Sequence, residues 1–312
     1  MDSKNDSIDY TPLVSKLAKS LLSSNDKDVD SKTFKVLGCN FTADCYSVDA
    51  KNVYYGTTKI NGADPASFKI LTKNNTREIY YYAKDKKNLY NFGEIEKIDA
   101  DINTIEIIDR FYKKDKNYVY YENKRMEQSD SKTFVVLDRG FSKDKNSVYY
   151  YGKRLLINSK NAVFDKRDYV RDENYIYYGG QILENVDITS FVLLEEEYSR
   201  DKNNIYYAGR KLSNPNLATF EVIKKDKSGN NGEYAKDKNS VYYNEKRLSN
   251  SDPKTFKIIS DNWEDYSLDK NNVYYGSEII IGADPKSFKK LDNVWMDKSN
   301  TYERGRKVEL KW

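Results

Sequence analysis

The sequence of 312 residues contains no histidine. This absence excludes histidine general bases, histidine metal ligands and Ser-His-Asp chemistry. Cysteine is also scarce, with Cys39 and Cys45 as the two present, and two thiolates alone cannot complete a zinc site. The pair either bridges one hairpin or remains as two buried thiols. We favour free thiols, because two cysteines in a long chain do not make a disulfide framework.

Long apolar runs are missing as well, so the sequence predicts neither a signal peptide nor a membrane span. A cytoplasmic location without membrane association is expected, and an exported protein whose signal has been removed is the alternative. The net charge is +4, from 53 basic and 49 acidic residues. This near balance does not indicate nucleic acid, which is left open as a partner. Glycine motifs for phosphates or dinucleotides are absent, and no cofactor is expected.

What the sequence does contain is a repeated block that begins at an aspartate. The aspartates are Asp49, Asp85, Asp115, Asp144, Asp172, Asp201, Asp237 and Asp269, and a worn ninth copy follows Asp297. Each of the eight precedes an apolar residue by 19 or 20 positions: Phe68, Ile105, Phe134, Phe164, Phe191, Phe220, Phe256 and Phe288. The spacing from that residue to the next aspartate varies from 8 to 17. A constant block joined by variable loops is typical of a repeat array.

The pattern inside each block predicts short β-strands. In the copy at Asp201, Tyr198 stands three residues before the aspartate and Ile205 four residues after it. Asp-Lys-Asn is turn chemistry, so Tyr-x-x-Asp and Val-Tyr-Tyr are expected to form a hairpin. Asp-Pro-x-Ser/Thr-Phe, as in residues 252–256, predicts one helical turn before the next strand.

These features favour an all-β fold, a tandem array of about nine short antiparallel units, over residues 31–312. An open superhelix is favoured over a closed propeller, because propeller blades contain about 40–45 residues and nine blades are unusual. Residues 1–30 stand outside the array, with a polar N-terminus and then Leu13, Leu17 and Leu21 on one helical face. We expect an amphipathic helix that caps the array, and a docking helix for a partner is the alternative.

The run Asp-Lys-Asn-x-Val-Tyr-Tyr resembles the bacterial DKNYY repeat family over about residues 31 to 312. The motif is specific because it recurs in register. The second copy departs from it with Asn-Leu-Tyr-Asn at residues 88–91, and the ninth with Asn-Thr-Tyr-Glu at residues 300–303. The resemblance implies a repeat architecture. It implies no activity, substrate or catalytic residue.

Two kinds of site chemistry are considered and not favoured. Asp-x-Asn matches the first two ligand positions of a calcium loop, but the glycine and glutamate that complete such a loop are missing. Acidic residues are numerous, yet no pair stands out for glycoside hydrolysis. The sequence therefore predicts no metal site and no catalytic residue, and turn formation explains the repeated aspartates.

Tyrosine, present 29 times, is the more informative residue. The worn copies keep the first tyrosine of the pair, Tyr90 and Tyr302, and lose the second to Asn91 and Glu303. The first is therefore expected in the core and the second nearer a rim. Core packing is the simpler interpretation of the second tyrosine too, and an aromatic recognition surface is the functional one. The candidate binding residues are Tyr150, Tyr178, Tyr207 and Tyr243, with Lys224, Lys225 and Lys227 of a long loop.

The sequence thus predicts a non-catalytic repeat protein, expected to be a monomer, that binds a protein partner. One form of this hypothesis is an intracellular bacterial or phage inhibitor that occludes a defence nuclease. The alternatives are an exported cell-surface or periplasmic interaction protein, and a carbohydrate-binding or glycoside-acting protein.

Overall fold

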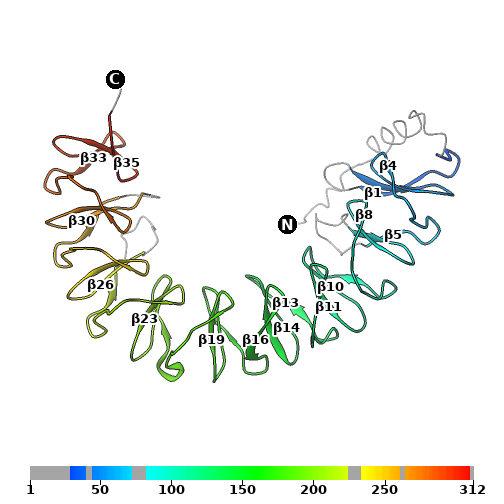
Figure 1. The fold of residues 1–312 in the computed structure, drawn as a ribbon, viewed down its shortest axis with the longest axis horizontal. Helices are drawn as coiled ribbons and strands as arrows, with labels where there is room; N and C mark the ends of the chain where they lie inside the picture. The colour runs from blue at the N-terminus through cyan, green and yellow to red at the C-terminus, as the bar shows by residue number, and fades with distance from the viewer. Residues whose placement is uncertain (1–28, 40–43, 72–81, 224–232, 261–263, 310–312) are drawn as a thin grey trace, which may run out of the picture. The chain divides into compact units, whose positions relative to one another are not determined.

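The computed structural model describes residues 29–39, 44–71, 82–223, 233–260 and 264–309. Within these ranges the chain forms nine four-stranded antiparallel sheets, one after another, and none of them closes on itself (Figure 1). The predicted all-β tandem array is confirmed. The predicted capping helix falls in residues 1–28 and lies outside the described ranges.

Each sheet contains four strands that are consecutive in the chain. The first four sheets are β1 (Lys35–Cys39), β2 (Cys45–Val48), β3 (Val53–Tyr55) and β4 (Thr58–Lys59); β5 (Lys69–Ile70), β6 (Tyr82–Lys84), β7 (Leu89–Asn91) and β8 (Glu94–Ile95); β9 (Glu106–Ile107), β10 (Tyr112–Lys114), β11 (Val119–Tyr121) and β12 (Lys124–Met126); and β13 (Val135–Val136), β14 (Phe141–Lys143), β15 (Ser147–Tyr150) and β16 (Lys153–Asn158).

The remaining five sheets follow the same order. They are β17 (Val163–Phe164), β18 (Tyr169–Arg171), β19 (Ile176–Tyr178) and β20 (Gln181–Ile182); β21 (Val192–Leu193), β22 (Tyr198–Arg200), β23 (Ile205–Tyr207) and β24 (Arg210–Lys211); β25 (Glu221–Val222), β26 (Tyr234–Lys236), β27 (Val241–Tyr243) and β28 (Lys246–Arg247); β29 (Lys257–Ile258), β30 (Tyr266–Leu268), β31 (Val273–Tyr275) and β32 (Glu278–Ile279); and β33 (Lys289–Leu291), β34 (Val294–Met296), β35 (Thr301–Glu303) and β36 (Arg306–Val308).

The chain divides into two compact units, Met1–Lys160 and Asn161–Trp312. The first unit contains sheets one to four, and the second contains sheets five to nine. Each unit is described by itself below. Three turns recur in every sheet: a leading turn before the first strand, the Asp-Lys-Asn turn between the second and third strands, and a tip turn between the third and fourth strands.

Alternation of side chains buries both faces of a sheet, as sheet six shows. Tyr198 pairs with Tyr207, and Ser199 pairs with Tyr206, so the two pairs point to opposite faces. On one face Tyr206 packs into a cluster with Tyr169, Ile176 and Leu183 of sheet five and with Phe191, which precedes β21. On the other face Tyr198, Ile205 and Leu212 pack against Ala235 and Tyr242 of sheet seven. The core of each unit therefore lies between consecutive sheets, and sheet six contributes to two clusters.

The helical turn predicted before each first strand takes two forms. In sheet six it is a 3-10 helix, η1 (Ile188–Ser190), and the Asp187 side chain accepts a hydrogen bond from the Ser190 amide. Elsewhere it is a single turn, closed in sheet eight by the bond from the Thr255 amide to the Asp252 carbonyl at 3.2 Å.

Phe164 is not the buried anchor that its spacing suggests, since 36% of its surface is exposed. The buried anchors Phe134 and Phe191 stand immediately before a first strand. In sheet five the first strand begins at Val163, so the anchor position falls on Ala162. The preceding strand β16 has six residues, and its register with β15 is irregular.

Cys39 and Cys45 form a disulfide between β1 and β2, with the sulfur atoms 1.93 Å apart. The expectation of free thiols is therefore wrong, and the hairpin bridge is correct. The physical reason is the register, because Cys39 and Cys45 are direct cross-strand partners. Cysteine count alone does not reveal this pairing. Among the described residues, no helix is long and apolar enough to cross a membrane.

Candidate functional site

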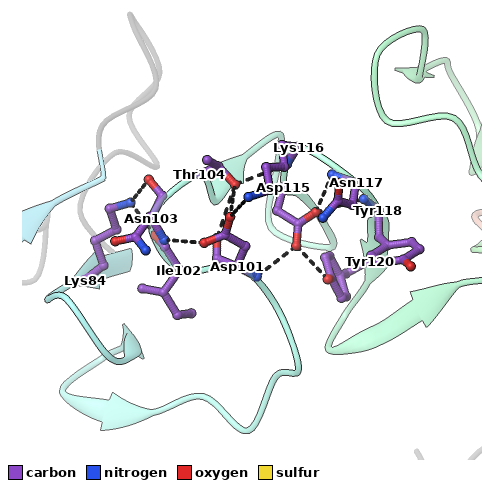
Figure 2. A network of polar contacts seen from close by, with 10 residues as sticks. All are labelled: Lys84, Asp101, Ile102, Asn103, Thr104, Asp115, Lys116, Asn117, Tyr118 and Tyr120. Carbon is purple, nitrogen blue, oxygen red and sulfur yellow. Dashed lines mark hydrogen bonds and ion pairs between the residues drawn. The ribbon is translucent and has the colours of Figure 1, made fainter.

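The turn aspartate is the most connected polar residue of each sheet, and Asp115 is shown in Figure 2. One carboxylate oxygen accepts hydrogen bonds from the amides of Asn117 and Tyr118 at 2.7 and 2.8 Å. The other accepts from the Tyr120 hydroxyl at 2.8 Å and from the Asp101 amide at 2.9 Å. Burial disfavours the charged carboxylate, but these donors outweigh burial and hold the pKa of Asp115 below its usual range.

The lysine that follows the turn aspartate completes this connection to the leading turn. Lys116 Nζ lies 2.9 Å from the Asp101 carboxylate, and its amide donates to Thr104 Oγ1 at 3.2 Å (Figure 2). The buried Lys84 of the preceding sheet also donates to this turn, through the Asn103 carbonyl at 2.9 Å. Asp115 and Lys116 thus bind the leading turn, and Tyr120 binds Asp115. We call this arrangement of turn aspartate, following lysine and first tyrosine the clasp.

The clasp recurs along the chain. Four donors of the same kinds meet the carboxylates of Asp49, Asp85, Asp144, Asp201, Asp237, Asp269 and Asp297. Folding contacts therefore occupy the aspartate, the lysine and the first tyrosine of the motif. The described residues contain no group of three or more Cys, Asp or Glu side chains placed to hold a metal ion.

The second tyrosines are half-buried, and each packs edge-on or tilted against an aromatic ring of the neighbouring strand. The ring centroids of Tyr207 and Tyr198 are 4.9 Å apart, and those of Tyr178 and Tyr169 are 4.8 Å apart. Tyr243 and Tyr150 have the same arrangement in their sheets. The three predicted lysines at positions 224, 225 and 227 lie outside the described residues.

The tip turn of the following sheet covers the second tyrosine. A Cβ atom added to Gly209 would lie 2.7 Å from Cβ of Tyr178, and the Gly209 amide donates to the Tyr169 hydroxyl at 3.2 Å. The same approach occurs between Gly152 and Tyr121, and between Gly305 and Tyr275. The second tyrosine is therefore a spacer between consecutive sheets that leaves one edge of its ring at the surface.

Carboxylates surround the second tyrosines of the second unit. The Tyr178 hydroxyl donates to Glu197 Oε2 at 3.1 Å. Burial, together with the nearby charges of Glu233 and Glu197, raises the pKa of Tyr207 to about 12. Burial also raises the pKa of Tyr243, with a hydrogen bond to Glu233 acting in the same direction. These phenols remain protonated hydrogen-bond donors at neutral pH.

The tip turns of the first unit expose two aromatic rings that the sequence reasoning missed. Phe92 and Tyr151 are 47% and 49% exposed, with φ angles of +48° and +43°. Glycine occupies the same place in other tip turns, at Gly56, Gly179 and Gly276. Positive φ is unusual for a bulky residue. An alignment of the repeats shows a large ring at a turn position that favours glycine, and this signal could have identified both residues.

Arg110 lies beside this aromatic edge. Its guanidinium carbon is 4.3 Å from the centroid of the Phe111 ring. Phe111 in turn lies 5.9 Å from Tyr121, centroid to centroid. The edge of the first unit therefore combines exposed rings with a cation, whereas the corresponding edge of the second unit combines tyrosine hydroxyls with carboxylates.

Comparison with known proteins gives one family. The model of the DKNYY family matches residues 22–153 and 169–306. No curated protein and no solved structure matches the chain. The matched ranges span most of the sequence and contain the turn aspartate of all nine sheets. The chain belongs to the DKNYY family.

Proposed function

We propose that this chain is a non-catalytic repeat protein that binds a protein partner through the tip turns of its first unit. The observation that carries this proposal is the pair Phe92 and Tyr151, bulky aromatic residues that are half exposed at positive φ. Strained backbone of this kind persists where a function needs it. Exposed aromatic side chains are the commonest anchors of protein interfaces.

The clasp supports the non-catalytic part of the proposal. The repeated aspartates, lysines and first tyrosines hold leading turns in place, and their hydrogen bonds account for their recurrence. The second tyrosines Tyr207 and Tyr243 have raised pKa values, so they do not act as bases at neutral pH. What varies from sheet to sheet is the tip turn, and variation on a constant scaffold is characteristic of binding surfaces.

The test replaces the two rings by the residue that their backbone favours. Phe92→Gly with Tyr151→Gly removes both anchors and relieves the positive φ, so the melting temperature should stay the same or rise. Capture of the cellular partner by immobilised protein should fall at least tenfold, which corresponds to about 1.4 kcal/mol. The matched control is Glu122→Gly, because Glu122 occupies the same tip-turn position at φ +54° without a ring.

Capture that survives the double substitution would contradict the proposal. Retention of glycans in place of a protein would favour the carbohydrate-binding alternative. Turnover of a substrate that depends on one Asp or Glu would contradict the non-catalytic assignment.

The disulfide favours an exported setting for this interaction. Disulfides form and persist in oxidising compartments and are rare in the cytosol. The Cys39–Cys45 bridge therefore supports a cell-surface or periplasmic interaction protein over an intracellular inhibitor of a defence nuclease. Thiol labelling of the protein taken directly from its source cell tests this choice, because free Cys39 and Cys45 would favour the intracellular form.

We further propose that the array is an open superhelix and not a closed propeller. In support, every sheet is a separate four-stranded meander, and within each unit consecutive sheets join face to face through apolar clusters. Such stacking does not require the last sheet to return to the first. Small-angle scattering of the intact protein distinguishes an elongated particle from a compact ring.

A further inference from the structure

The fourth strands of five sheets carry an adjacent pair of basic residues. The pairs are Lys124 and Arg125, Lys153 and Arg154, Arg210 and Lys211, Lys246 and Arg247, and Arg306 and Lys307. All ten side chains are exposed. We call the four pairs at sheets three, four, six and seven the basic edge. Two of these pairs fall in neighbouring sheets of the first unit, and two in neighbouring sheets of the second.

Alternation along the strand directs the two residues of a pair toward opposite neighbouring sheets. Lys124 pairs with Tyr121 and Arg125 with Tyr120, so they lie on opposite faces of sheet three. The contacts agree with this geometry. Arg154 of sheet four donates to Gln128 of the preceding sheet. Lys124 and Arg154 therefore project toward the junction between sheets three and four.

The junction between sheets six and seven has the same construction. Arg210 of sheet six lies 3.0 Å from Glu245, which belongs to the tip turn of sheet seven. Arg247 pairs with Tyr242 and points back toward sheet six. Stacked sheets are separated by about 10 Å, so each junction presents a short row of cations.

Protection of an exposed edge strand against aggregation does not explain why these side chains are positively charged. Charged side chains of either sign prevent edge-to-edge aggregation. Sheets two and eight carry Glu94 and Glu278 on their fourth strands, which shows that an acidic residue is accommodated there. A protective role therefore leaves the paired cations of the other sheets unexplained.

The surroundings of the basic edge fit phosphates better than an acidic protein. In sheets three, six and seven the residue after the pair is a buried aliphatic: Met126, Leu212 and Leu248. These fourth strands thus expose charge without an apolar anchor. Protein interfaces depend on buried aromatic and apolar anchors. Contacts to a phosphate backbone are made by Lys and Arg alone and do not require one.

The near balance of total charge conceals this edge. Many of the carboxylates are occupied inside the fold, as the turn aspartates are, and the lysines of the clasp are paired with leading turns. Among the described residues, two members of the basic edge form ion pairs with carboxylates, Arg125 with Glu127 and Arg210 with Glu245. The charge that remains available to a ligand at the basic edge is therefore positive.

We propose that the basic edge binds the phosphate backbone of double-stranded nucleic acid without reading its sequence. This activity is independent of the protein-binding proposal, since it uses the fourth strands and not the rings of Phe92 and Tyr151. Sequence-independent binding follows from the composition of β12, β24 and β28, which carry no exposed aromatic or amide side chain that could reach base edges.

The experiment measures binding of the full-length protein to a short labelled DNA duplex by fluorescence anisotropy over a range of salt concentrations. Lys124→Gln, Arg154→Gln, Arg210→Gln and Arg247→Gln together should weaken binding roughly tenfold or more at low salt. The slope of log affinity against log salt should fall by about one for each of these residues that contacts a phosphate. The control removes four exposed lysines of first strands, Lys35→Gln, Lys69→Gln, Lys257→Gln and Lys289→Gln, and should leave affinity close to that of the unaltered protein.

Both quadruple variants change the net charge by the same amount, so the comparison separates the edge from the total charge. Equal losses in the two variants would overturn the proposal, and so would a protein that does not bind the duplex at low salt. Poly-glutamate that binds as tightly as the duplex, and through the same four basic residues, would also overturn it in favour of an acidic protein.

Discussion

A single carboxylate connects three segments of sheet six. Asp201 accepts hydrogen bonds from the Asn203 and Asn204 amides, from the Tyr206 hydroxyl and from the Asp187 amide. Its side chain is 1% exposed. Burial raises its pKa and these donors lower it, with a net shift downward, so the charge is stabilised where a buried carboxylate would otherwise be unfavourable. Removing the acceptor leaves several buried donors without a partner.

Asp201→Ala should therefore lower the free energy of unfolding by about 3 kcal/mol or more, because each buried donor left unpaired costs about 1–3 kcal/mol. Tyr206→Phe removes one donor to a charged acceptor and should cost about 1.5–3 kcal/mol. Asn203→Ala is the control, since the exposed Asn203 contributes its amide and not its side chain. Urea unfolding measures all three. A loss of under about 1 kcal/mol for Asp201→Ala would show that water replaces the clasp.

The carboxylates also set the response to acid. Burial opposes the charge of Asp297, but its hydrogen bonds outweigh burial and lower the pKa to about 2. The bond to Lys270 lowers the pKa of Asp252 to about 2. A carboxyl group with a folded pKa below its unfolded value, near 3.9, contributes stability above that value and loses it as pH falls through the folded pKa.

We therefore expect stability to be constant between about pH 4.5 and pH 9 and to fall between about pH 4 and pH 2. Circular dichroism during acid titration measures the transition. Asp297→Asn removes one titrating group and should make the loss of stability less steep. An unfolding midpoint above about pH 5 would contradict the assignment, because the chain has no histidine to titrate there.

Local turn chemistry could be predicted at the residue scale, and long-range partners could not. The Asp-Lys-Asn motif indicated that the Asp201 side chain accepts hydrogen bonds from the next backbone amides, because these donors are neighbours in the chain. The bond to the Asp187 amide spans 14 residues, and the equivalent bond at Asp237 spans 21. Because segments of different length separate the turn aspartate from the amide of the leading turn, the sequence spacing does not reveal this hydrogen bond. Phe92 and Tyr151 were overlooked because the repeats were compared for the residues that they share, and these two positions differ from repeat to repeat.

At the scale of the element, the tip turn and the second tyrosine fit together with no space between them. Gly209 has a φ of +74°, and an added Cβ would meet Tyr178 at 2.7 Å. Gly282 has a φ of +81° and no atom within 4 Å of an added Cβ. The two glycines share the backbone requirement and differ in the contact. They form a matched pair for measuring the junction between sheets.

Gly282→Ala should cost about 1 kcal/mol, the penalty for an L-residue in the left-handed region. Gly209→Ala should cost this amount and a further 1–3 kcal/mol or so for overpacking against Tyr178. Thermal or urea unfolding gives both values. The combination of Gly209→Ala with Tyr178→Gly should cost less than the sum of the two single changes, because glycine at 178 removes the Cβ atom that the added Cβ would meet. Additive losses would mean that the turn moves away from the tyrosine.

Serine on the second strand provides another matched pair between sheets. Ser142 Oγ donates to the Tyr112 hydroxyl of the preceding sheet at 3.2 Å. Ser47 occupies the same position in sheet one, and its buried Oγ has no hydrogen-bond partner among the described residues. Ser142→Ala should therefore cost about 1 kcal/mol, and Ser47→Ala should be neutral or stabilising. Unfolding midpoints compare the two, and equal losses would assign the cost to packing of the hydroxyl.

At the scale of the whole chain, the repeat count and strand content were predictable because period-2 burial and turn residues act over a few positions. The disulfide was not, because pairing of Cys39 with Cys45 depends on a register that is itself a product of folding. The face-to-face stacking was also not evident. Both Tyr198 and Tyr206 are buried on opposite faces of one sheet, and sequence alternation alone does not say what covers each face.

Stacking of this kind limits how far a local change spreads. Within the second unit, separate clusters join sheets five and six, six and seven, seven and eight, and eight and nine. No described cluster joins sheet six to sheet nine. Stability should therefore be a sum of sheet and junction contributions, and a defect in one sheet should weaken its neighbours most.

Asp201→Ala in sheet six tests this expectation by amide hydrogen exchange. Protection should fall most in β22 and β23, less in the strands of sheets five and seven, and least in sheet nine around β35. The reason is that opening sheet six exposes its two junctions, whereas the cluster of Tyr266, Phe288 and Trp295 between sheets eight and nine is untouched. Asn203→Ala, which keeps the clasp, should leave exchange unchanged throughout. An equal loss of protection in sheets six and nine would mean that the second unit opens as one cooperative body, in which case the junctions are stronger than the sheets that they join.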